Sequence, residues 1–358
     1  MTMNLSHLPQ QCRSGGFNLS ELMIAMAIGM IVLAGMATLF ATNSRAQAEI
    51  EKNNRQVENG RYAVQMLSSD IVNAGYYSEF DSSRMPDPAA LPAPCQNVLA
   101  QLHAGLAFPV QGVDNAQNVD LPCLAGHDLK EGTDVVVVRR TQTCLPGAGN
   151  CAPVASGGVF FQASLCLDGS ELGNALVTEH YRLDTTIANL DRRGYGCDAT
   201  KLADQRRYLT HIYFVSNNGV GADGIPTLKR AELGGRPNAL SFAIVPLVEG
   251  VENLQIEYGI DKDAVGVPAL YHANPSTAMQ CGEPVCDVKD WRAVVALKLN
   301  ILARNVEPSS GFTDTKSYTL GKKADGSAYT VPAQNDQFKR HVYQTVVTMP
   351  NPAGRRTP

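Results

Sequence analysis

The chain has 358 residues, of which 44% are hydrophobic and 18% are charged, and its formal net charge at pH 7 is −4. This length is sufficient for one large domain or two of ordinary size, and the composition is that of a globular protein. The mild acidity and the lack of a cluster of lysines and arginines argue against nucleic acid as a partner.

An apolar run near the N-terminus is the first predicted element. No charged residue occurs from 22 to 42, and Arg45 is the first charge after Glu21. About 20 such residues, each rising about 1.5 Å in a helix, span the roughly 30 Å hydrocarbon core of a bilayer. A secretory signal cleaved near Ala46-Gln47-Ala48 is one alternative, but its apolar part normally has only about 7–15 residues. A plain single-pass anchor is another, and it leaves Glu21 without a role.

The residues before the run suggest a third interpretation. A short polar leader, MTMNLSHLPQQCRSGG, ends in glycine, and Glu21 stands five residues after that glycine. Together with the apolar run, this pattern resembles the class III signal peptide of type IV prepilins and pseudopilins. The resemblance implies that prepilin peptidase cleaves between Gly16 and Phe17 on the cytoplasmic face. It also implies N-methylation of Phe17 and a role for Glu21 in filament assembly and subunit register.

The nine cysteines indicate the compartment. Cys12 precedes the apolar run, and an even set follows it: Cys95, Cys123, Cys144, Cys151, Cys166, Cys197, Cys281 and Cys286. This distribution favours an oxidising compartment with as many as four disulfides over scattered reduced thiols in a cytosolic domain. We therefore expect the N-terminus to be cytoplasmic and the bulk of the chain periplasmic. The positive-inside rule does not decide the orientation, because the basic residue Arg13 precedes the apolar run while Arg45, Lys52 and Arg55 follow it.

After the apolar run, the heptad spacing of Ile50, Val57, Val64 and Ile71 predicts that the helix continues with an apolar stripe. Leu67 and Ala74 occupy a second seam, which Asn53 and Gly60 weaken, and Gly75 is a suitable stop. We expect this half of the helix to dock on the chain's own sheet. A coiled coil with another helix is the alternative.

The rest of the chain reads as antiparallel sheet with long loops. Residues 81–130 are rich in proline and alanine, and we expect an ordered loop pinned by a disulfide. Strand-like runs bounded by turn residues follow at 133–142, 158–167, 176–183, 207–218, 239–248, 252–261, 292–305 and 338–349. With the helix on one face of this sheet, the fold class is α+β.

Nearness in the sequence suggests disulfides Cys144–Cys151 and Cys281–Cys286, which leaves Cys95–Cys123 and Cys166–Cys197. Other pairings stay open, because eight cysteines allow 105 connectivities. The cysteine spacing predicts no zinc site, since no C-x2-C pair repeats and no histidine stands at ligand spacing.

The resemblance extends beyond the leader. Segments 58–77, 247–261, 294–305 and 341–352 are similar to blocks of PilW-like minor pilins, and related blocks occur in the J-type pseudopilin of type II secretion. At Tyr77-Ser78-Glu79 the sequence lacks the Gly-Cys expected after the helix. The resemblance implies a type IV pilin-like fold. It divides the chain into a leader (1–16), a transmembrane and assembly half of the helix (17–44), an amphipathic half (45–76) and a β-rich globular domain (77–358).

Signs of catalysis and of ligand binding are scarce. No G-x-S-x-G, H-E-x-x-H, P-loop or dinucleotide-binding motif occurs, so we expect neither an enzyme nor a cofactor. The histidines His180, His211 and His341 are isolated within strand-like runs. Asp261 and Asp263, or Asp223, could bind calcium in a loop but do not fit EF-hand spacing, and we expect no metal. Trp291, the single tryptophan, is expected to pack in the core or at a sheet edge.

The expected function is that of a minor pilin that helps to initiate type IV pilus assembly, near the tip and in complex with other minor pilins. The partners implied are prepilin peptidase, other minor pilins, the major pilin, the inner-membrane assembly platform and a tip adhesin. The protein would reside in the inner membrane and then in the pilus at the cell surface, with roles in cell adhesion and twitching motility. A pseudopilin of type II secretion is the nearest alternative. A single-pass anchored periplasmic enzyme or adhesin is an alternative from a different class.

Overall fold

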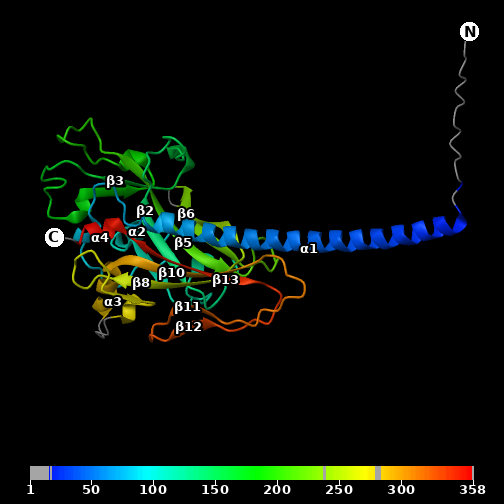
Figure 1. Ribbon diagram of the computed structural model, residues 1–358. Coiled ribbons are helices and arrows are strands. Elements are labelled where there is room, and N and C mark those ends of the chain that lie inside the picture. The colour runs from blue at the N-terminus through cyan, green and yellow to red at the C-terminus, as the bar shows by residue number, and fades with distance from the viewer. Residues whose placement is uncertain (1–15, 17, 237–238, 279–283, 357–358) are drawn as a thin grey trace, which may run out of the picture. The chain divides into compact units, whose positions relative to one another are not determined.

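The computed structural model describes residues 16, 18–236, 239–278 and 284–356 (Figure 1). Its α-helices are α1 (Leu19–Ile71), α2 (Leu99–Gly105), α3 (Pro284–Arg292) and α4 (Pro350–Gly354). Short 3-10 helices lie at Ser82–Arg84, Pro122–Leu124, Val154–Ser156, Val177–His180, Ile187–Asn189 and Pro275–Thr277. The chain forms two compact units, residues 1–51 and residues 52–358, and α1 contributes to both.

Antiparallel strands build the second unit. Strands of the first sheet are β1 (Val110–Val113), β2 (Val135–Thr141), β3 (Val159–Ala163), β4 (Tyr181–Asp184), β5 (Gln205–Ser216), β6 (Thr227–Arg236) and β7 (Ala239–Glu249). They follow the order β1-β2-β5-β3-β4, with β6 paired to β5 and β7 paired to β6. Strands of the second sheet are β13 (Arg340–Thr348), β10 (Val294–Arg304), β8 (Val251–Ile260) and β9 (Leu270–His272), in that order. A hairpin of β11 (Tyr318–Lys322) and β12 (Ala328–Val331) completes the set.

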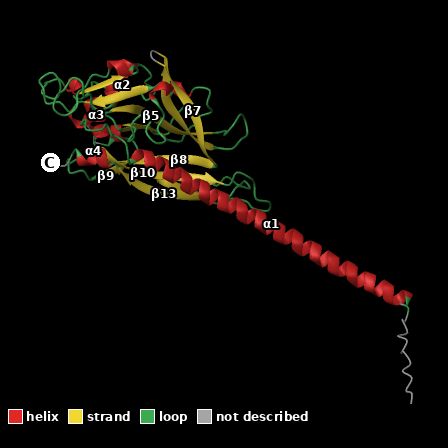
Figure 2. Cartoon of the chain, turned by 90° about the horizontal axis from the view of Figure 1, so that it is seen from above, coloured by secondary structure: helices red, strands yellow, loops and turns green. Residues whose placement is uncertain are grey.

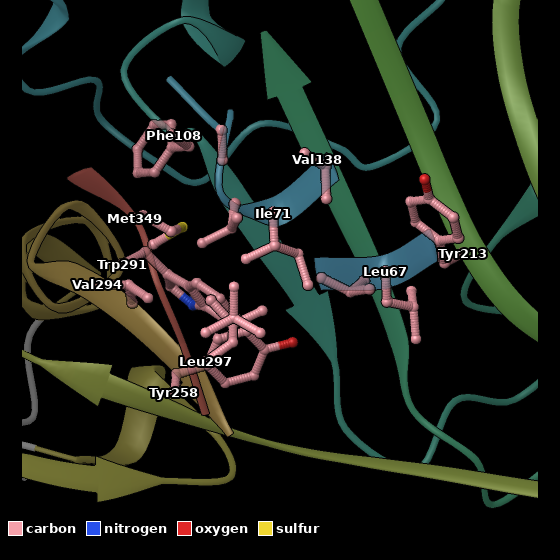
Figure 3. Close-up of a cluster of buried hydrophobic side chains, with 14 of the residues drawn as sticks. Leu67, Ile71, Phe108, Val138, Tyr213, Tyr258, Trp291, Val294, Leu297 and Met349 are labelled. Carbon is pink, nitrogen blue, oxygen red and sulfur yellow. The ribbon is translucent and has the colours of Figure 1, made fainter. Parts of the chain in front are cut away.

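The two sheets and the end of α1 share one hydrophobic core. Figure 3 shows Leu67 and Ile71 of α1 near Val138 of β2, with Tyr258 and Leu297 of the second sheet in the same cluster. The central strands β8 and β10 are buried along almost their whole length, as expected for strands covered on both faces. The long N-terminal helix packed on antiparallel sheets confirms the α+β fold class.

Asp134, at the start of β2, links the two sheets. Its backbone N–H donates to the Leu254 carbonyl oxygen (2.9 Å), and its carboxylate accepts a hydrogen bond from the Ile256 N–H (2.7 Å). Burial raises the pKa of the Asp134 carboxyl well above its usual range, and the nearby Asp114 carboxyl raises it further. Asp134 thus joins strand β8 to strand β2, and the Asn115 N–H (2.9 Å) is a second backbone donor to its buried carboxyl group.

The buried stripe of α1 differs from the heptad prediction. Ile50 and Val57 are 60% and 37% exposed, so the predicted first seam is wrong in its first half. The residues that are buried are Gln56, Gly60, Ala63, Leu67, Asp70 and Ile71. Apart from the adjacent pair Asp70 and Ile71, successive buried residues are three or four positions apart, which places them on one face of the helix. Polar side chains can occupy this stripe because the body supplies partners: Gln56 donates to the carbonyl oxygens of Ala303 (3.0 Å) and Lys339 (2.9 Å).

Gly60 does not weaken the seam, contrary to the prediction. A Cβ atom at this position would lie 2.1 Å from Cε2 of Tyr343, a residue of β13. The missing side chain is therefore what allows the Tyr343 ring to pack against the helix, and the Tyr343 hydroxyl donates to the Gln56 carbonyl oxygen (3.4 Å).

The end of α1 is held without a disulfide to the helix. After Ile71 the chain turns, and Gly75 adopts a φ of 72°, in agreement with its predicted role as a stop. The Gly75 N–H donates to the Arg139 carbonyl oxygen (2.9 Å). Tyr77 is fully buried, with its ring 5.7 Å from Phe161 and 6.4 Å from Tyr208. Aromatic packing thus occupies the place where the resemblance implied a Gly-Cys.

The predicted strands coincide with β2, β3, β5, β7, β8, β10 and β13. Segment 176–183 is instead a 3-10 helix followed by β4. Residues 81–130 were expected to be loop, which is wrong in part, because α2 and β1 lie there. The sequence prediction also lacked β6, whose Lys229, Arg230 and Glu232 interrupt the apolar alternation on which a strand prediction depends.

Candidate functional site

The apolar surface of α1 is the most prominent candidate site. Among the described residues, α1 is the helix that is long and apolar enough to cross a membrane, and none of its 18-residue apolar window is buried within the structure. Exposed side chains include Leu22, Ile24, Met30, Ile31, Leu39 and Phe40. Burying such side chains is worth about 1.5–3 kcal/mol each, so this segment gains stability only in lipid or against other apolar helices.

Polar groups inside this segment are satisfied by the helix itself. The Thr38 hydroxyl donates to the Gly35 carbonyl oxygen (2.8 Å), and the Thr42 hydroxyl donates to the Thr38 carbonyl oxygen (2.9 Å). Bonds of this kind remove the cost of placing a hydroxyl group in hydrocarbon. The two threonines are therefore compatible with a buried assembly surface.

Glu21 lies in the first turn of α1 and is exposed. Its carboxylate accepts a hydrogen bond from the Asn18 backbone N–H (3.1 Å), which is one of the amides that a helix start leaves unpaired. A carboxylate there also interacts favourably with the positive end of the helix dipole. Gly16, the residue expected before the cleavage point, is exposed, and Phe17 lies outside the described residues. The local bond gives Glu21 a capping role that sequence reasoning did not anticipate.

A buried charge cluster ties α1 to the first sheet. Asp70 is 4% exposed, and its carboxylate lies 2.5 Å from Nε of Arg140 on β2 and 2.7 Å from Nδ1 of His211 on β5. The Tyr213 hydroxyl donates a further hydrogen bond to it (2.8 Å). Burial raises the pKa of the Asp70 carboxyl, but the His211 and Arg140 side chains outweigh burial and hold this pKa well below its usual range. The helix is thus fixed to the body by an ionised carboxylate with three partners.

Sequence reasoning missed Asp70, because one aspartate within a helical stripe carries no signal of its partners. Two of the three isolated histidines make structural contacts. His211 belongs to the Asp70 cluster, and His180 is buried with its Nε2 2.9 Å from the Asn174 carbonyl oxygen. His341 is exposed on β13.

The structure contains three of the four expected disulfides, Cys95–Cys123, Cys144–Cys151 and Cys166–Cys197. Their Cα atoms are 5.5, 6.4 and 4.8 Å apart, respectively. Cys281 and the side chain of Cys286 lie outside the described residues. The pairs cross-link segments outside the strands of the first sheet.

Of the three aspartates considered for calcium, Asp223 and Asp261 hold loops together, and Asp263 is exposed. Asp223 accepts hydrogen bonds from the backbone N–H groups of Gly219 (2.9 Å), Val220 (2.8 Å) and Ile225 (3.0 Å). Asp261 is fully buried and pairs with Nε of Arg356 (2.9 Å). Across the described residues no group of three or more acidic, histidine or cysteine side chains could hold a metal ion.

Trp291 lies in the core at 3% exposure, and its Nε1–H donates to the Ser276 hydroxyl (3.0 Å). Its ring is 4.7 Å from that of Tyr258, in an edge-on arrangement. The buried ring with a satisfied N–H agrees with the expected packing role.

Comparison with known proteins gives a family match for part of the chain. Residues 212–351 match the family described as "PilW: Type IV Pilus-assembly protein W". This match confirms the resemblance to PilW-like proteins and overlaps three of the segments that carried it, 247–261, 294–305 and 341–352. A type IV-like pilin from Thermus thermophilus is similar in structure, with 14% identity, a TM-score of 0.36, and coverage of 83% of this chain and 97% of that one. No match was found among the curated proteins.

Proposed function

From the match of residues 212–351 to the type IV pilus-assembly protein W family, we propose that this chain is a minor pilin. It is incorporated into type IV pili and helps to initiate their assembly, near the tip and in complex with other minor pilins. The single observation that supports this most strongly beside the family match is the exposed apolar segment of α1. A soluble enzyme would leave this apolar surface exposed to water, whereas a pilin subunit buries it first in the membrane and then against other subunits in the filament.

The first step is processing in the inner membrane. Prepilin peptidase removes residues 1–16 on the cytoplasmic face and methylates the Phe17 amine, while residues 77–358 lie in the periplasm. The helical segment 17–44 then anchors the subunit and later packs against other subunits, and segment 45–76 fixes it to the body. The three disulfides support this orientation, because they persist in an oxidising compartment.

Glu21 supplies the register in the filament. When the apolar segment enters the assembly, the Glu21 carboxylate pairs with the Phe17 amine of a neighbouring subunit, away from water. An unpaired charge in such a place costs about 3–5 kcal/mol, so the pair selects one axial offset between subunits. In the membrane-anchored state the same carboxylate caps the helix through the Asn18 N–H.

In this role the protein would contact the other minor pilins, the major pilin, the assembly platform and a tip adhesin. The role is structural and requires no cofactor.

Deleting the gene is expected to abolish or strongly reduce surface pili, counted by electron microscopy, and the full-length gene should restore them. Normal piliation accompanied by a loss of protein secretion would instead identify a pseudopilin of type II secretion. Catalytic activity of the purified chain with normal piliation would favour the anchored enzyme.

Processing has its own test. Intact-mass measurement of the mature protein is expected to show a chain that begins at N-methylated Phe17. An intact Met1, or a chain that begins at Glu49, would contradict the pilin assignment. Gly16→Ala should block cleavage and leave the leader in place, which separates processing from assembly.

A further inference from the structure

A basic cavity of about 590 Å³ opens on the body beside α3 and α4. All of its lining residues belong to the second unit and come from five separate segments, within 82–87, 107–109, 261–262, 289–293 and 352–356. The helix α4 lies beside the end of α1 (Figures 1 and 2), where the Asn351 side chain donates to the Ala74 carbonyl oxygen (3.2 Å). Neither the pilus role nor the family match assigns a function to this cavity.

We propose that this cavity binds an acidic peptide segment of a partner protein. Five cationic side chains line it: Lys262, Lys289, Arg292, Arg355 and Arg356. Asp87 and Asp261 are the carboxylates in the same lining, so the positive charges exceed the negative ones by three. Asp81, which pairs with Arg355 from outside the lining (3.6 Å), reduces this excess to two.

Each lining arginine has a carboxylate partner, which is Asp87 for Arg292, Asp81 for Arg355 and Asp261 for Arg356, and backbone carbonyls hold the guanidinium groups as well. The Arg292 guanidinium donates to the carbonyl oxygens of Ser83 (2.7 Å) and Met85 (2.9 Å) and also contacts Asp87. The Arg355 guanidinium donates to the Gly75 carbonyl oxygen (3.1 Å). These contacts fix the guanidinium groups, so they need little further ordering to donate to a second carboxylate, and the excess of two positive charges is carried by Lys262 and Lys289.

Two lysines complete the site at its rim. Lys262 and Lys289 are exposed, and neither has a side-chain partner among the residues that the structure describes. They are therefore available to an incoming carboxylate. Their position near fixed arginines creates a local positive field on a chain whose net charge is −4.

The size and the walls of the cavity favour a peptide over a small ion. Its volume falls within the range of about 300–1,000 Å³ that is typical of sites for sizeable ligands. Apolar side chains of Met85, Pro109 and Pro352 share the lining and can pack against the aliphatic stem of a glutamate or the backbone next to it. Nucleic acid is disfavoured, because its backbone needs an extended basic stripe.

The test uses the full chain in detergent micelles and a fluorescein-labelled hexaglutamate peptide as the probe, with binding followed by fluorescence anisotropy at low salt. The wild-type chain should bind the peptide. The double variant K262E/K289E should bind at least tenfold more weakly, and K262Q/K289Q several-fold more weakly. K316E/K323E is the matched control, because it makes the same charge change at two other exposed lysines and should bind like the wild type. Thermal unfolding of each variant verifies that it is folded.

Equal loss of binding in the cavity variants and in the control would overturn the proposal, and so would equal binding of hexaglutamine. Complete displacement of the peptide by an equimolar concentration of inorganic phosphate would assign the cavity to a small anion instead. Because the assay needs no filament, its outcome is independent of whether the chain proves to be a pilin.

Discussion

The carboxylate of Asp70 on α1 lies 2.7 Å from Nδ1 of His211 on β5, with Nε of Arg140 at 2.5 Å on its other oxygen. The residues Asp70 and His211 are 141 positions apart in the sequence. Their contact connects the buried end of α1 to strand β5 of the first sheet.

Asp70→Asn should destabilise the protein by about 2–4 kcal/mol, because it leaves the partly buried Arg140 guanidinium without its anion. Urea unfolding of the full chain in detergent, followed by circular dichroism, measures the loss. Asp263→Asn is the control, since Asp263 is exposed and should change stability by less than about 0.5 kcal/mol. Equal stability of D70N and wild type would show that the cluster does not fix the helix.

The same cluster has a pH signature. The pKa of the Asp70 carboxyl is lower in the folded state than in the unfolded chain, so its contribution is fully present above the unfolded pKa of about 3.9 and is lost as the pH falls further. The difference in unfolding free energy between wild type and D70N is therefore expected to stay constant from pH 7 to 5 and to shrink below pH 4. Because all other carboxylates are present in both proteins, their contribution to the pH dependence cancels in this difference. A difference that grows on acidification would contradict the assigned direction.

Gly60→Ala should destabilise the body by about 1–3 kcal/mol, because the new methyl group meets the Tyr343 ring. Gly35→Ala in the same helix is the matched control, since nothing lies within 4 Å of a Cβ there. That change should leave the body unaffected and favour the helix by up to about 1 kcal/mol. Thermal unfolding of both variants makes the comparison, and equal behaviour would mean that the ring moves aside without cost.

Glu21 variants separate capping from register. Glu21→Ala and Glu21→Gln should both be processed at Gly16 and both fail to support pili, because each removes the charge that would pair with the Phe17 amine. Glutamine retains an acceptor for the Asn18 N–H, so restored piliation in E21Q alone would assign Glu21 to capping. Glu51→Gln, an exposed change further along α1, is the control and should support normal pili.

Removing a disulfide should cost more stability when the loop that it closes is longer. The chain-entropy estimate is about 4 kcal/mol for Cys166–Cys197, with a separation of 31 residues, and about 2 kcal/mol for Cys144–Cys151, with a separation of 7. Paired cysteine-to-serine variants compared by urea unfolding provide the measurement. The reverse order of stability loss would show that native-state packing, and not loop closure, controls the effect.

Local patterns in the sequence determined much of this protein. The leader and the uncharged run predict an N-terminal apolar helix, and the alternation of apolar residues predicts most of the longer strands. Nearness along the chain suggests Cys144–Cys151, and sequential pairing of the remaining cysteines gives the other two disulfides observed. These features depend on neighbours within one element or one loop, and hydrophobic periodicity reports such neighbours directly.

Only the tertiary structure decided which face of α1 is buried. The stripe through Gln56, Gly60 and Asp70 looks unfavourable in sequence, because two of these residues are polar and one has no side chain. Its partners, Ala303, Tyr343 and His211, lie on strands more than 140 residues away. The basic cavity likewise forms from five distant segments. A buried polar group is favourable only where it has a hydrogen-bond partner, and a glycine in a buried stripe is favourable only where another side chain packs against it. The fold supplies both kinds of partner.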